Sequence, residues 1–313
     1  MKIGFLLYPT ASVKIAEDSS FWIMRELAGR GHSVVYFESG RMSLKNGAVL
    51  VHASRARLDR RRGYLPSPPS PKPIDLATLD AIFIRKEPPF DTEYLYALQM
   101  LDTLKKKVFV LNDPAGIALS NEKLFSLLFQ RYAPESVATS SAAAAAHFVR
   151  ETGRAIVKPL DDKGGAGIFA THPKDRNLAS LLNLATEGGK KTVLVQRFVA
   201  ADRHGDKRIV LLNGEILGAF LRRPPSHDYR ANLSTGGTMH RASVNAFERK
   251  MVEAISPELL KRGLYFVGLD VIGKHLTEIN VTSPAGIPEI HQYDKSFPEK
   301  KVADFIERSV IRR

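Results

Sequence analysis

The sequence predicts an α/β protein whose N-terminal part is a parallel, doubly wound sheet. Strand and helix signals alternate over about the first 130 residues, and such alternation indicates βαβ units with parallel strands. After about residue 130 the strands follow one another more closely, with glycine-rich turns between them. The chain has 313 residues, 44% of them hydrophobic, which suffices for one large unit or for two to three modest domains.

The elements predicted in the first part alternate along the chain. The expected strands are residues 3–8, 33–37, 81–85 and 108–111. A helix at 21–28, which Ser19 or Ser20 would cap, and a helix at 91–106, with apolar side chains at helical spacing, lie between them. Pro114 is expected to open a further helix that runs through 121–129.

The second part is predicted to contain more strands than helices. Helices are expected at 139–150 and 244–262, and strands at 155–158, 168–171, 192–198, 207–212, 215–221, 267–272 and 276–280. Asn213-Gly214 is typical of a two-residue hairpin turn. The long polar stretch 223–241 is rich in Pro, Ser and Gly, which favours a lid or a disordered loop.

Composition narrows the function classes. The chain has no cysteine, which excludes disulfides, thiolate metal sites and cysteine nucleophiles and is compatible with the cytoplasm. No apolar run is long enough to span a membrane, and residues 1–8 are expected to form a core strand and not a signal peptide. The net charge of +13 suits an anionic ligand such as a nucleotide, a polycarboxylate or a nucleic acid.

Part of the basic charge is local. Residues 55–62 are rich in arginine and precede the proline-rich stretch 64–73, a combination that is typical of an exposed, solvated loop. Nucleic-acid binding by 55–62 is an alternative that we place lower, because aromatic residues do not interleave with the arginines.

Asp270, Glu278 and Asn280 place three oxygen donors within the otherwise apolar segment 267–284. Glu278 and Asn280 share one face of a strand, since side chains alternate with a period of two. If the turn spans the three residues 273–275, Asp270 lies opposite Glu278 and all three donors meet. Buried donors would need a cation, and oxygen ligands without His or Cys suit Mg²⁺. A solvated outer face of a hairpin explains this pattern equally well.

Other candidate residues are ambiguous by themselves. The turn Gly164–Gly167 could bring backbone N–H groups to phosphate oxygens, but most glycine-rich turns are only turns. Lys158 lies at the end of an apolar strand. It could bind a phosphate, or it could lie on an edge strand, where a lysine prevents pairing with other chains. Lys123 could bind a phosphate, or it could be a solvated lysine on a surface helix. Three arginines lie on or beside the late strands and the predicted lid, namely Arg208, Arg222 and Arg230. Each could bind a carboxylate or a phosphate, unless its side chain lies in solvent.

A series of short motifs runs along the chain in a fixed order. They are Asp18-Ser-Ser-Phe21, Ile84-Arg-Lys-Glu-Pro-Pro-Phe-Asp91, Asn121-Glu-Lys, Val157-Lys-Pro-Leu-Asp161, Gly164-Gly-Ala-Gly-Ile-Phe169, Asp206-Lys-Arg208, Arg230-Ala-Asn-Leu233, Gly268-Leu-Asp-Val-Ile-Gly273 and Thr277-Glu-Ile-Asn-Val-Thr-Ser-Pro284. Together they resemble the bacterial glutathione synthetases, a family of ATP-grasp ligases. The likeness extends from near residue 1 to about residue 290.

The resemblance implies a fold and an activity. A Rossmann-like (pre-ATP-grasp) substrate domain would span 1–122, followed by a two-subdomain α+β ATP-grasp fold over 123–313. The central subdomain, 123–200, would carry the glycine-rich loop, and the C-terminal subdomain, 201–313, would carry the lid and the Mg²⁺ site. The implied reaction is the ATP- and Mg²⁺-dependent ligation of γ-glutamylcysteine with glycine through an acyl phosphate. The resemblance further implies two Mg²⁺ ions, for which Mn²⁺ could substitute, and a cytoplasmic homotetramer with no nucleic-acid or membrane partner.

The resemblance also assigns roles to residues. ATP would be bound by Lys123, Lys158, Gly164, Gly165, Gln196, Phe198, Val199 and Asp206. The metal would be held by Asp270, Glu278 and Asn280. Catalysis would involve Arg208, Arg222, Arg230 and Asn232. The acid and amine substrates would be bound by Asp18, Ser19, Arg85, Lys86, Thr282 and Ser283.

One segment departs from the family pattern. Members of the family commonly have an arginine before the Glu-Ile pair that follows Thr-Ser-Pro, whereas this chain has Pro288. A missing cation beside a ligase site could change how a substrate carboxylate is held. The sequence therefore leaves open a related ligase that joins a different acid to a different amino acid or peptide.

Overall fold

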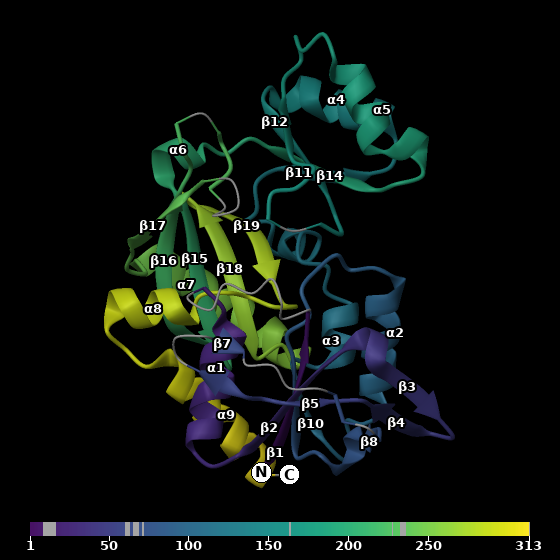
Figure 1. Cartoon of the computed structure of the whole chain (residues 1–313). Coiled ribbons are helices and arrows are strands. Elements are labelled where there is room, and N and C mark those ends of the chain that lie inside the picture. Colours follow the sequence, from purple (N-terminus) through teal and green to yellow (C-terminus); the bar gives the residue numbers. More distant parts are fainter. Residues whose placement is uncertain are drawn as a thin grey trace.

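The computed structural model describes residues 1–8, 17–59, 63–64, 69–70, 72–162, 164–226, 228–231 and 236–312. It is built from three main sheets that are stacked along one direction (Figure 1). The N-terminal sheet lies at the bottom of that view beside both chain ends, the C-terminal sheet lies above it, and the central sheet lies at the top.

The N-terminal sheet has the strand order β10-β9-β1-β2-β5. Its strands are β1 (Lys2–Leu7), β2 (Ser33–Glu38), β5 (Ser54–Arg55), β9 (Ala81–Ile84) and β10 (Phe109–Leu111). Only the edge strand β5 pairs antiparallel among these, so the predicted parallel sheet is confirmed. The helices α1 (Ser19–Gly29) and α2 (Thr92–Asp102) are close to their predicted positions.

Short elements lie between β2 and β9: η2 (Ser39–Arg41), β3 (Met42–Lys45), β4 (Ala48–Val51), β6 (Leu58–Asp59), β7 (Gly63–Tyr64), β8 (Ile74–Asp75) and η3 (Leu76–Thr78). Strand β6 and parts of β5 and β7 fall within the stretches 55–62 and 64–73, which were predicted to form an exposed loop. Arg55 and Arg57 are exposed, whereas the rest of the basic cluster, residues 60–62, lies outside the described residues.

Two predicted helices begin or end differently because side chains bond to the backbone. Asp18 caps α1 by accepting from the N–H groups of Ser20 (2.7 Å) and Phe21 (3.3 Å), so the predicted caps Ser19 and Ser20 lie inside the helix. The helix predicted from Pro114 is broken into α3 (Pro114–Ala118) and η4 (Phe125–Phe129). Between them the Asn121 side chain accepts from two backbone N–H groups, which favours a new turn over a continuing helix.

The central sheet is antiparallel, with the order β11-β14-β12-β13. Its elements are β11 (Ser136–Thr139), α4 (Ala142–Thr152), β12 (Ala155–Pro159), β13 (Phe169–Thr171), α5 (Leu178–Ala185), η5 (Glu187–Gly189) and β14 (Val193–Arg197). The helix predicted from residue 139 starts later because Ser141 caps it by accepting from Ala144 N–H. Helices α4 and α5 lie together on this sheet (Figure 1).

The C-terminal sheet is also antiparallel, with the order β17-β16-β15-β18-β19. Its elements are α6 (Ala201–His204), β15 (Asp206–Leu212), β16 (Glu215–Arg223), β17 (Thr238–Arg241), α7 (Ala246–Lys261), β18 (Phe266–Ile272), β19 (His275–Asn280), α8 (Ile287–Asp294) and α9 (Pro298–Ile311). Asn213 (φ 52°) and Gly214 (φ 78°) form the predicted two-residue turn. Strand β17 shortens the predicted lid to 224–237, of which 227 and 232–235 lie outside the described residues.

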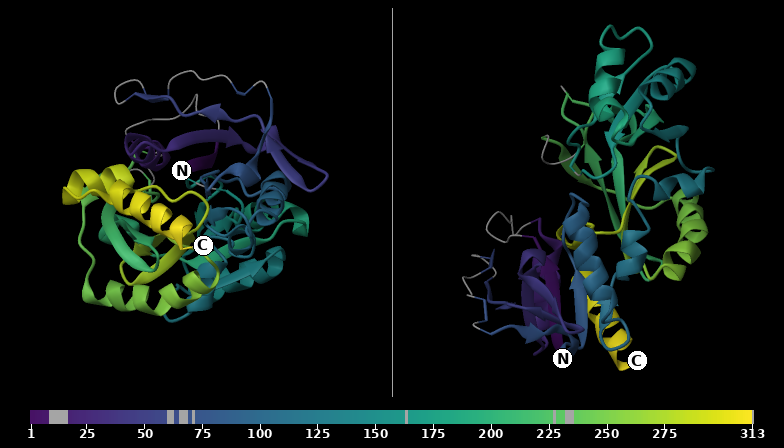
Figure 2. Two further views of the ribbon diagram at one scale, coloured as in Figure 1. Left: turned by 90° about the horizontal axis from the view of Figure 1, so that it is seen from below. Right: turned by 90° about the vertical axis from the view of Figure 1, so that its right-hand side faces the viewer.

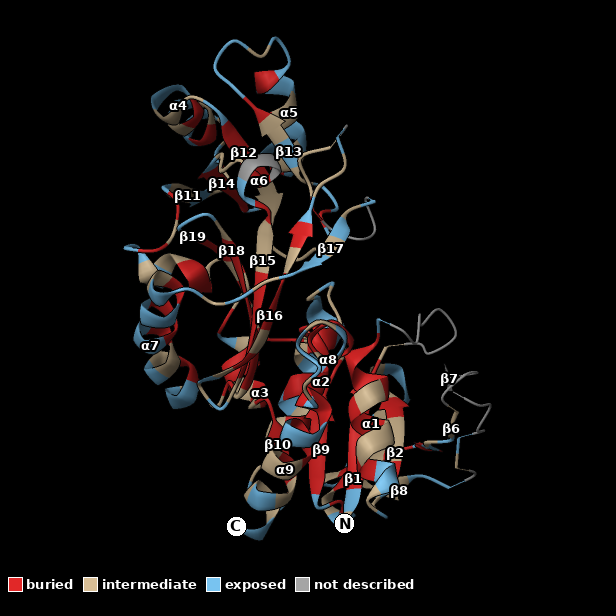
Figure 3. Cartoon of the chain, turned by 90° about the vertical axis from the view of Figure 1, so that its left-hand side faces the viewer, coloured by how far each residue is buried: buried red, intermediate tan, exposed pale blue. Residues whose placement is uncertain are grey.

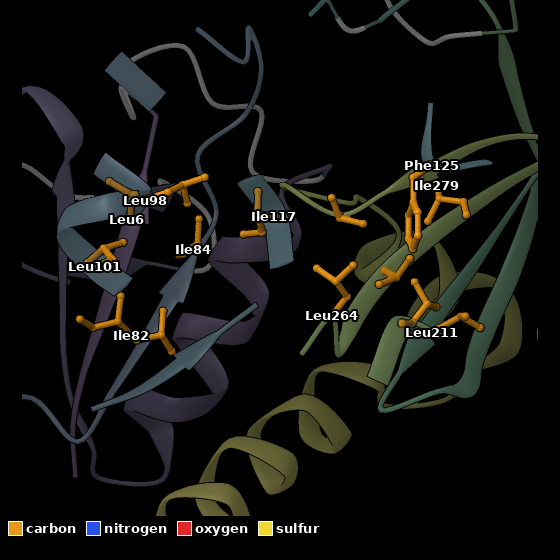
Figure 4. Packing of buried hydrophobic residues seen from close by; sticks show 14 of the residues in the cluster. Leu6, Ile82, Ile84, Leu98, Leu101, Ile117, Phe125, Leu211, Leu264 and Ile279 are labelled. Atoms are coloured by element: carbon orange, nitrogen blue, oxygen red, sulfur yellow. The ribbon is translucent and has the colours of Figure 1, made fainter. Parts of the chain in front are cut away.

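The N-terminal and C-terminal sheets share one hydrophobic core. Ile84 and Ile117 from the N-terminal side belong to the same buried cluster as Phe125, Leu264 and Ile279 (Figure 4). The inner strands of the sheets are buried along most of their length, whereas the helices have both buried and exposed residues (Figure 3). Helices α1 and α9 also pack together, and the two chain ends lie near each other (Figure 2). The N-terminal and C-terminal sheets are therefore held together by extensive packing, whereas the central sheet has a hydrophobic cluster of its own.

Asn245 is expected to contribute measurably to the stability of α7. Its side chain accepts from Glu248 N–H (2.9 Å), and the Glu248 side chain accepts from Asn245 N–H (2.8 Å), which completes a capping box. Asn245→Ala should lower the free energy of unfolding by about 1 kcal/mol, measured from the urea midpoint. Asn177→Ala is the matched control, because Asn177 precedes α5 without a side-chain cap bond. An equal effect of both substitutions would argue against the capping box.

Candidate active site

The hairpin β18–β19 brings the three predicted oxygen donors together. Asp270 pairs with Glu278, as expected, but the predicted three-residue turn is wrong, because the strands end at Ile272 and begin again at His275. A bulge at Thr277 restores the pairing: Val271 pairs with Leu276, and the next pair is Asp270 with Glu278. The Thr277 hydroxyl donates to the Asp270 carbonyl (3.1 Å), which holds the bulge in place.

Two arginines neutralise Asp270. Asp270 is 4% exposed. Arg208 donates to both oxygens of its carboxylate (Nη2 to Oδ2, 2.9 Å), and Arg222 Nη2 lies 3.0 Å from Oδ1. Burial opposes ionisation, but the two guanidinium groups prevail and hold the pKa of Asp270 well below its usual value. Asp270 therefore stays ionised in the interior because Arg208 and Arg222 compensate its charge.

Glu278 and Asn280 extend this polar cluster toward the lysines. Asn280 Nδ2 donates to Asp270 Oδ2 (3.2 Å) and to the Gly268 carbonyl (3.3 Å). Glu278 Oε1 lies 3.2 Å from Lys123 Nζ. Among the described residues no group of three or more His, Cys, Asp or Glu side chains is arranged to hold a metal, so the cluster comprises two carboxylates and one amide.

Lys123 and Lys158 place two cations beside the hairpin. Lys123 is 4% exposed and donates to the Asp162 carbonyl (2.7 Å). Lys158 Nζ donates to Gln196 Oε1 (3.0 Å). Burial, together with the nearby charge of Lys123, lowers the pKa of Lys158, although Glu278 acts in the opposite direction. An anionic ligand would satisfy both lysines and reverse this shift.

The two lysines and the hairpin β18–β19 line one pocket. All the residues that were predicted to bind nucleotide line it: Lys123, Lys158, Gly164, Gly165, Gln196, Phe198, Val199 and Asp206. Arg230, Asp270 and Glu278 also line it. Residues from the central sheet, the C-terminal sheet and the predicted lid thus converge on one pocket.

Two wall residues limit what a ligand can bond. The Phe198 N–H already donates to the Arg154 carbonyl (2.9 Å), so Phe198 can offer an adenine its carbonyl or its ring. Asp206 Oδ2 accepts from Arg222 Nη2 (2.6 Å), whereas Asp206 Oδ1 is buried and has no hydrogen-bond partner among the described residues. This oxygen suits a donor such as a ribose hydroxyl.

The lid contacts the glycine-rich loop directly. Arg230 Nη1 donates to the Gly165 carbonyl (3.0 Å), and Asp228 pairs with the same guanidinium (2.7 Å). The Tyr229 hydroxyl accepts from Ala170 N–H (3.1 Å) and donates to the Ile168 carbonyl (2.9 Å). No sequence signal singled out Tyr229. Asn232, the other predicted lid residue, lies outside the described residues.

The predicted substrate residues of the N-terminal part lie at a different junction. Ser19 is 1% exposed, and its hydroxyl accepts from the N–H groups of Gly286 (3.0 Å) and Ile287 (3.1 Å) at the start of α8. Arg85 donates to Ser20 Oγ (2.9 Å) and to the Pro284 carbonyl (3.0 Å). The bonds of Ser19 and Arg85 tie α1 and the end of β9 to the segment that precedes α8 and to its first residue, whereas Asp18 bonds only within the start of α1. Lys86 stacks on an aromatic ring, with Nζ 4.3 Å from the centroid of Tyr94.

Glu122 is a positioning residue that the sequence reasoning missed. Its Oε1 accepts from Val281 N–H (2.8 Å), Thr282 N–H (3.0 Å) and the Thr282 hydroxyl (2.8 Å). Thr282 is therefore buried and bonded within the protein, whereas Ser283 is partly exposed. The Asn121-Glu-Lys motif could have revealed this residue, because Glu122 lies within it.

Pro288, the departure from the family pattern, lies in the first turn of α8 and is buried. A proline is favourable there, since its fixed φ suits a helix start and its missing N–H would have no partner within the helix. The residue thus has a structural role that an arginine would not fulfil in the same way.

The chain has the ATP-grasp fold. Solved structures that resemble the chain over nearly its full length include D-alanyl-alanine synthetase A from Vibrio cholerae (TM-score 0.67, 14% identity, 99% of this chain and 98% of that chain). Another is a RimK domain ATP-grasp protein from Sphaerobacter thermophilus (TM-score 0.62, 16% identity, 98% and 99%). At such identities the likeness establishes the fold.

The sequence comparisons define the family. Residues 1–118 match the N-terminal domain of prokaryotic glutathione synthetase, and residues 122–295 match its ATP-grasp domain. The glutathione synthetases of Nitrosomonas europaea (38% identity, 100% of this chain and 99% of the relative) and Mesorhizobium japonicum (38%, 94% and 94%) are similar over nearly the whole chain. The chain belongs to the prokaryotic glutathione synthetase family and is an ATP-dependent ligase.

Proposed function

We propose that this ligase joins γ-glutamylcysteine to glycine and forms glutathione, ADP and phosphate. The substrate carboxylate would attack the γ-phosphoryl group of ATP, and the glycine amine would then displace phosphate from the acyl phosphate. The single observation that carries the proposal is the convergence of Lys123, Lys158 and the β18–β19 hairpin on the pocket that the lid covers.

The residues of the pocket suit phosphoryl transfer. This reaction needs positioning and charge stabilisation more than a covalent contribution from the protein. Lys123 and Lys158 would bind the phosphates, together with the backbone of Gly164 and Gly165. Asp206 Oδ1 would accept from a ribose hydroxyl, since it lacks a partner among the described residues. Arg208 would stabilise the transferring phosphoryl group.

The donor set fits Mg²⁺ that arrives with the nucleotide. Glu278, Asn280 and Asp270 offer hard oxygen ligands, and Mg²⁺ commonly takes its remaining ligands from phosphates and water. Because Arg208 and Arg222 already bind Asp270, Glu278 is the more available carboxylate. When bound, the metal would neutralise developing charge on the phosphates. We propose two ions, with Mn²⁺ as a possible substitute.

The substrates themselves are tested by an acceptor screen. The purified protein should release ADP with γ-glutamylcysteine and glycine and much less when either is replaced. Turnover with another acid, amino acid or peptide, but not with this pair, would assign the chain to a related ligase.

The proposal includes a cytoplasmic homotetramer without a nucleic-acid partner. In the part of the chain that the structure describes, no helix is long and apolar enough to cross a bilayer. Light scattering would test the tetramer. Salt-sensitive retention on DNA or RNA, lost when Arg55 and Arg57 are neutralised, would instead favour the nucleic-acid alternative.

Arg230→Ala should uncouple ATP hydrolysis from amide formation. The substitution removes the guanidinium contact between the lid and the Gly165 carbonyl, so water would reach the acyl phosphate more easily. The expected result is more than one ADP released per amide formed. Arg223→Ala, at the exposed end of β16, is the matched control and should stay at one. A ratio of one in both variants would refute this role of the lid.

A further inference from the structure

Glu289 is a buried carboxyl that the roles described above do not use. It lies in the first turn of α8 and is 6% exposed. Its Oε2 is buried and has no hydrogen-bond partner among the described residues. Burying a carboxyl oxygen without a partner is costly, so a donor from a bound molecule would be stabilising here.

Other buried acids near the site already have partners. Asp270 is bound by Arg208, Asp206 by Arg222, and Glu122 by the backbone and hydroxyl of Thr282. Glu289 differs from them because its buried Oε2 has no hydrogen-bond partner among the described residues.

The location of Glu289 suits a substrate. Helix α8 packs against β16 and α1 (Figure 3). It begins directly after the segment that Arg85 binds at the Pro284 carbonyl, and Ser19 caps its first N–H groups. Glu289 thus belongs to the junction of the predicted substrate-binding segments.

The charges around Glu289 indicate what kind of molecule would bind. Burial, the largest effect, and the charge of Glu17 raise the pKa of Glu289 to about 7, although its own backbone N–H and the charges of Arg208 and Arg222 act in the opposite direction. Arginines suit the carboxylates of an amino-acid substrate. They cannot bind its ammonium group, which needs hydrogen-bond acceptors, and a carboxylate is an acceptor that also balances the charge.

We propose that Glu289 binds an ammonium group of an amino-acid substrate. Two sources share this chemistry, namely the α-ammonium of the γ-glutamyl group and the ammonium of glycine. The inference rests on the proposed function, because that function supplies both groups.

The test is steady-state kinetics of Glu289→Gln, which keeps the size of the side chain and removes its charge. A hydrogen bond to a charged group contributes enough that its loss should raise the KM of one substrate about 10- to 100-fold. The kcat should change little if the contact is the same in the ground and transition states. Glu253→Gln, on the exposed face of α7, is the matched control.

The two sources give different results. If the γ-glutamyl ammonium binds, the KM for γ-glutamylcysteine should rise, and the preference of the wild type for this substrate over glutarylcysteine, which lacks the amino group, should disappear. If the glycine ammonium binds, only the KM for glycine should rise.

If the wild type forms glutathione and both KM values of Glu289→Gln are unchanged, the inference about Glu289 is wrong and the proposed function stands. An inactive wild type would instead refute the proposed function itself. If circular dichroism shows that Glu289→Gln is misfolded, Glu289→Asp takes its place. This variant keeps the charge at a shorter reach, so the same KM should rise by a smaller factor, and an unchanged KM would again overturn the inference.

Discussion

Glu278→Gln should lower kcat by about 10²- to 10³-fold, the usual cost of removing one group that stabilises charge in a transition state. Glu278 lines the pocket and lies 3.2 Å from Lys123 Nζ. In the proposed metal site Glu278 is the more available carboxylate, because Arg208 and Arg222 bind Asp270. Glutamine keeps an oxygen for Lys123 but loses the charge that would bind the cation.

The fold should tolerate this change. The Glu278 side chain is 25% exposed, and a glutamine fits in the same space. The thermal midpoint should therefore stay close to that of the wild type, and Glu253→Gln on the exposed face of α7 should retain full activity. Wild-type turnover of Glu278→Gln at saturating Mg²⁺ would rule out the proposed metal site.

Asp270→Asn should instead destabilise the protein strongly. Asparagine cannot balance Arg208 and Arg222, which are 7% and 8% exposed. Breaking a buried ion pair by removing one partner typically costs about 3–5 kcal/mol, a large share of the roughly 5–15 kcal/mol by which proteins are stable. The urea midpoint should fall sharply, and activity should be lost as well.

The pH dependence of this effect follows from the pKa of Asp270. The folded-state pKa lies below the unfolded value, so the contribution of Asp270 is fully present above the unfolded pKa of about 4 and is lost only in strong acid. The difference in unfolding free energy between wild type and Asp270→Asn should therefore be nearly constant from about pH 5 to 8. Asp294→Asn, whose carboxylate is 3.9 Å from Arg241 at the surface, is the control. If Asp270→Asn and this control have equal urea midpoints, the Asp270 carboxylate is not needed to stabilise the buried Arg208 and Arg222.

The alternation of strands and helices allowed the parallel sheet to be predicted, because hydrophobic periodicity is a local property of the sequence. The pairing of Asp270 with Glu278 was also predicted, although for an incorrect reason. A two-residue turn followed by a bulge gives the same register as a three-residue turn, and the side-chain pattern alone does not separate the two.

Features that depend on distant residues were not predictable in the same way. The sequence suggested a cation beside Asp270, but only the order of the sheet, with β15 between β16 and β18, reveals that Arg208 and Arg222 supply it. Glu122 and Tyr229 act through hydrogen bonds to residues far along the chain. A motif can draw attention to a residue such as Glu122, but a single sequence does not show which distant residues its hydrogen bonds join.

The central claim is that the pocket couples ATP cleavage to the joining of γ-glutamylcysteine and glycine. The most direct measurement follows ADP and glutathione together, in one reaction that contains the purified protein, ATP, Mg²⁺ and both substrates. The claim predicts one glutathione for each ADP, and no sustained ADP release when glycine is omitted. ADP release that does not require γ-glutamylcysteine, or that yields no glutathione, would contradict it.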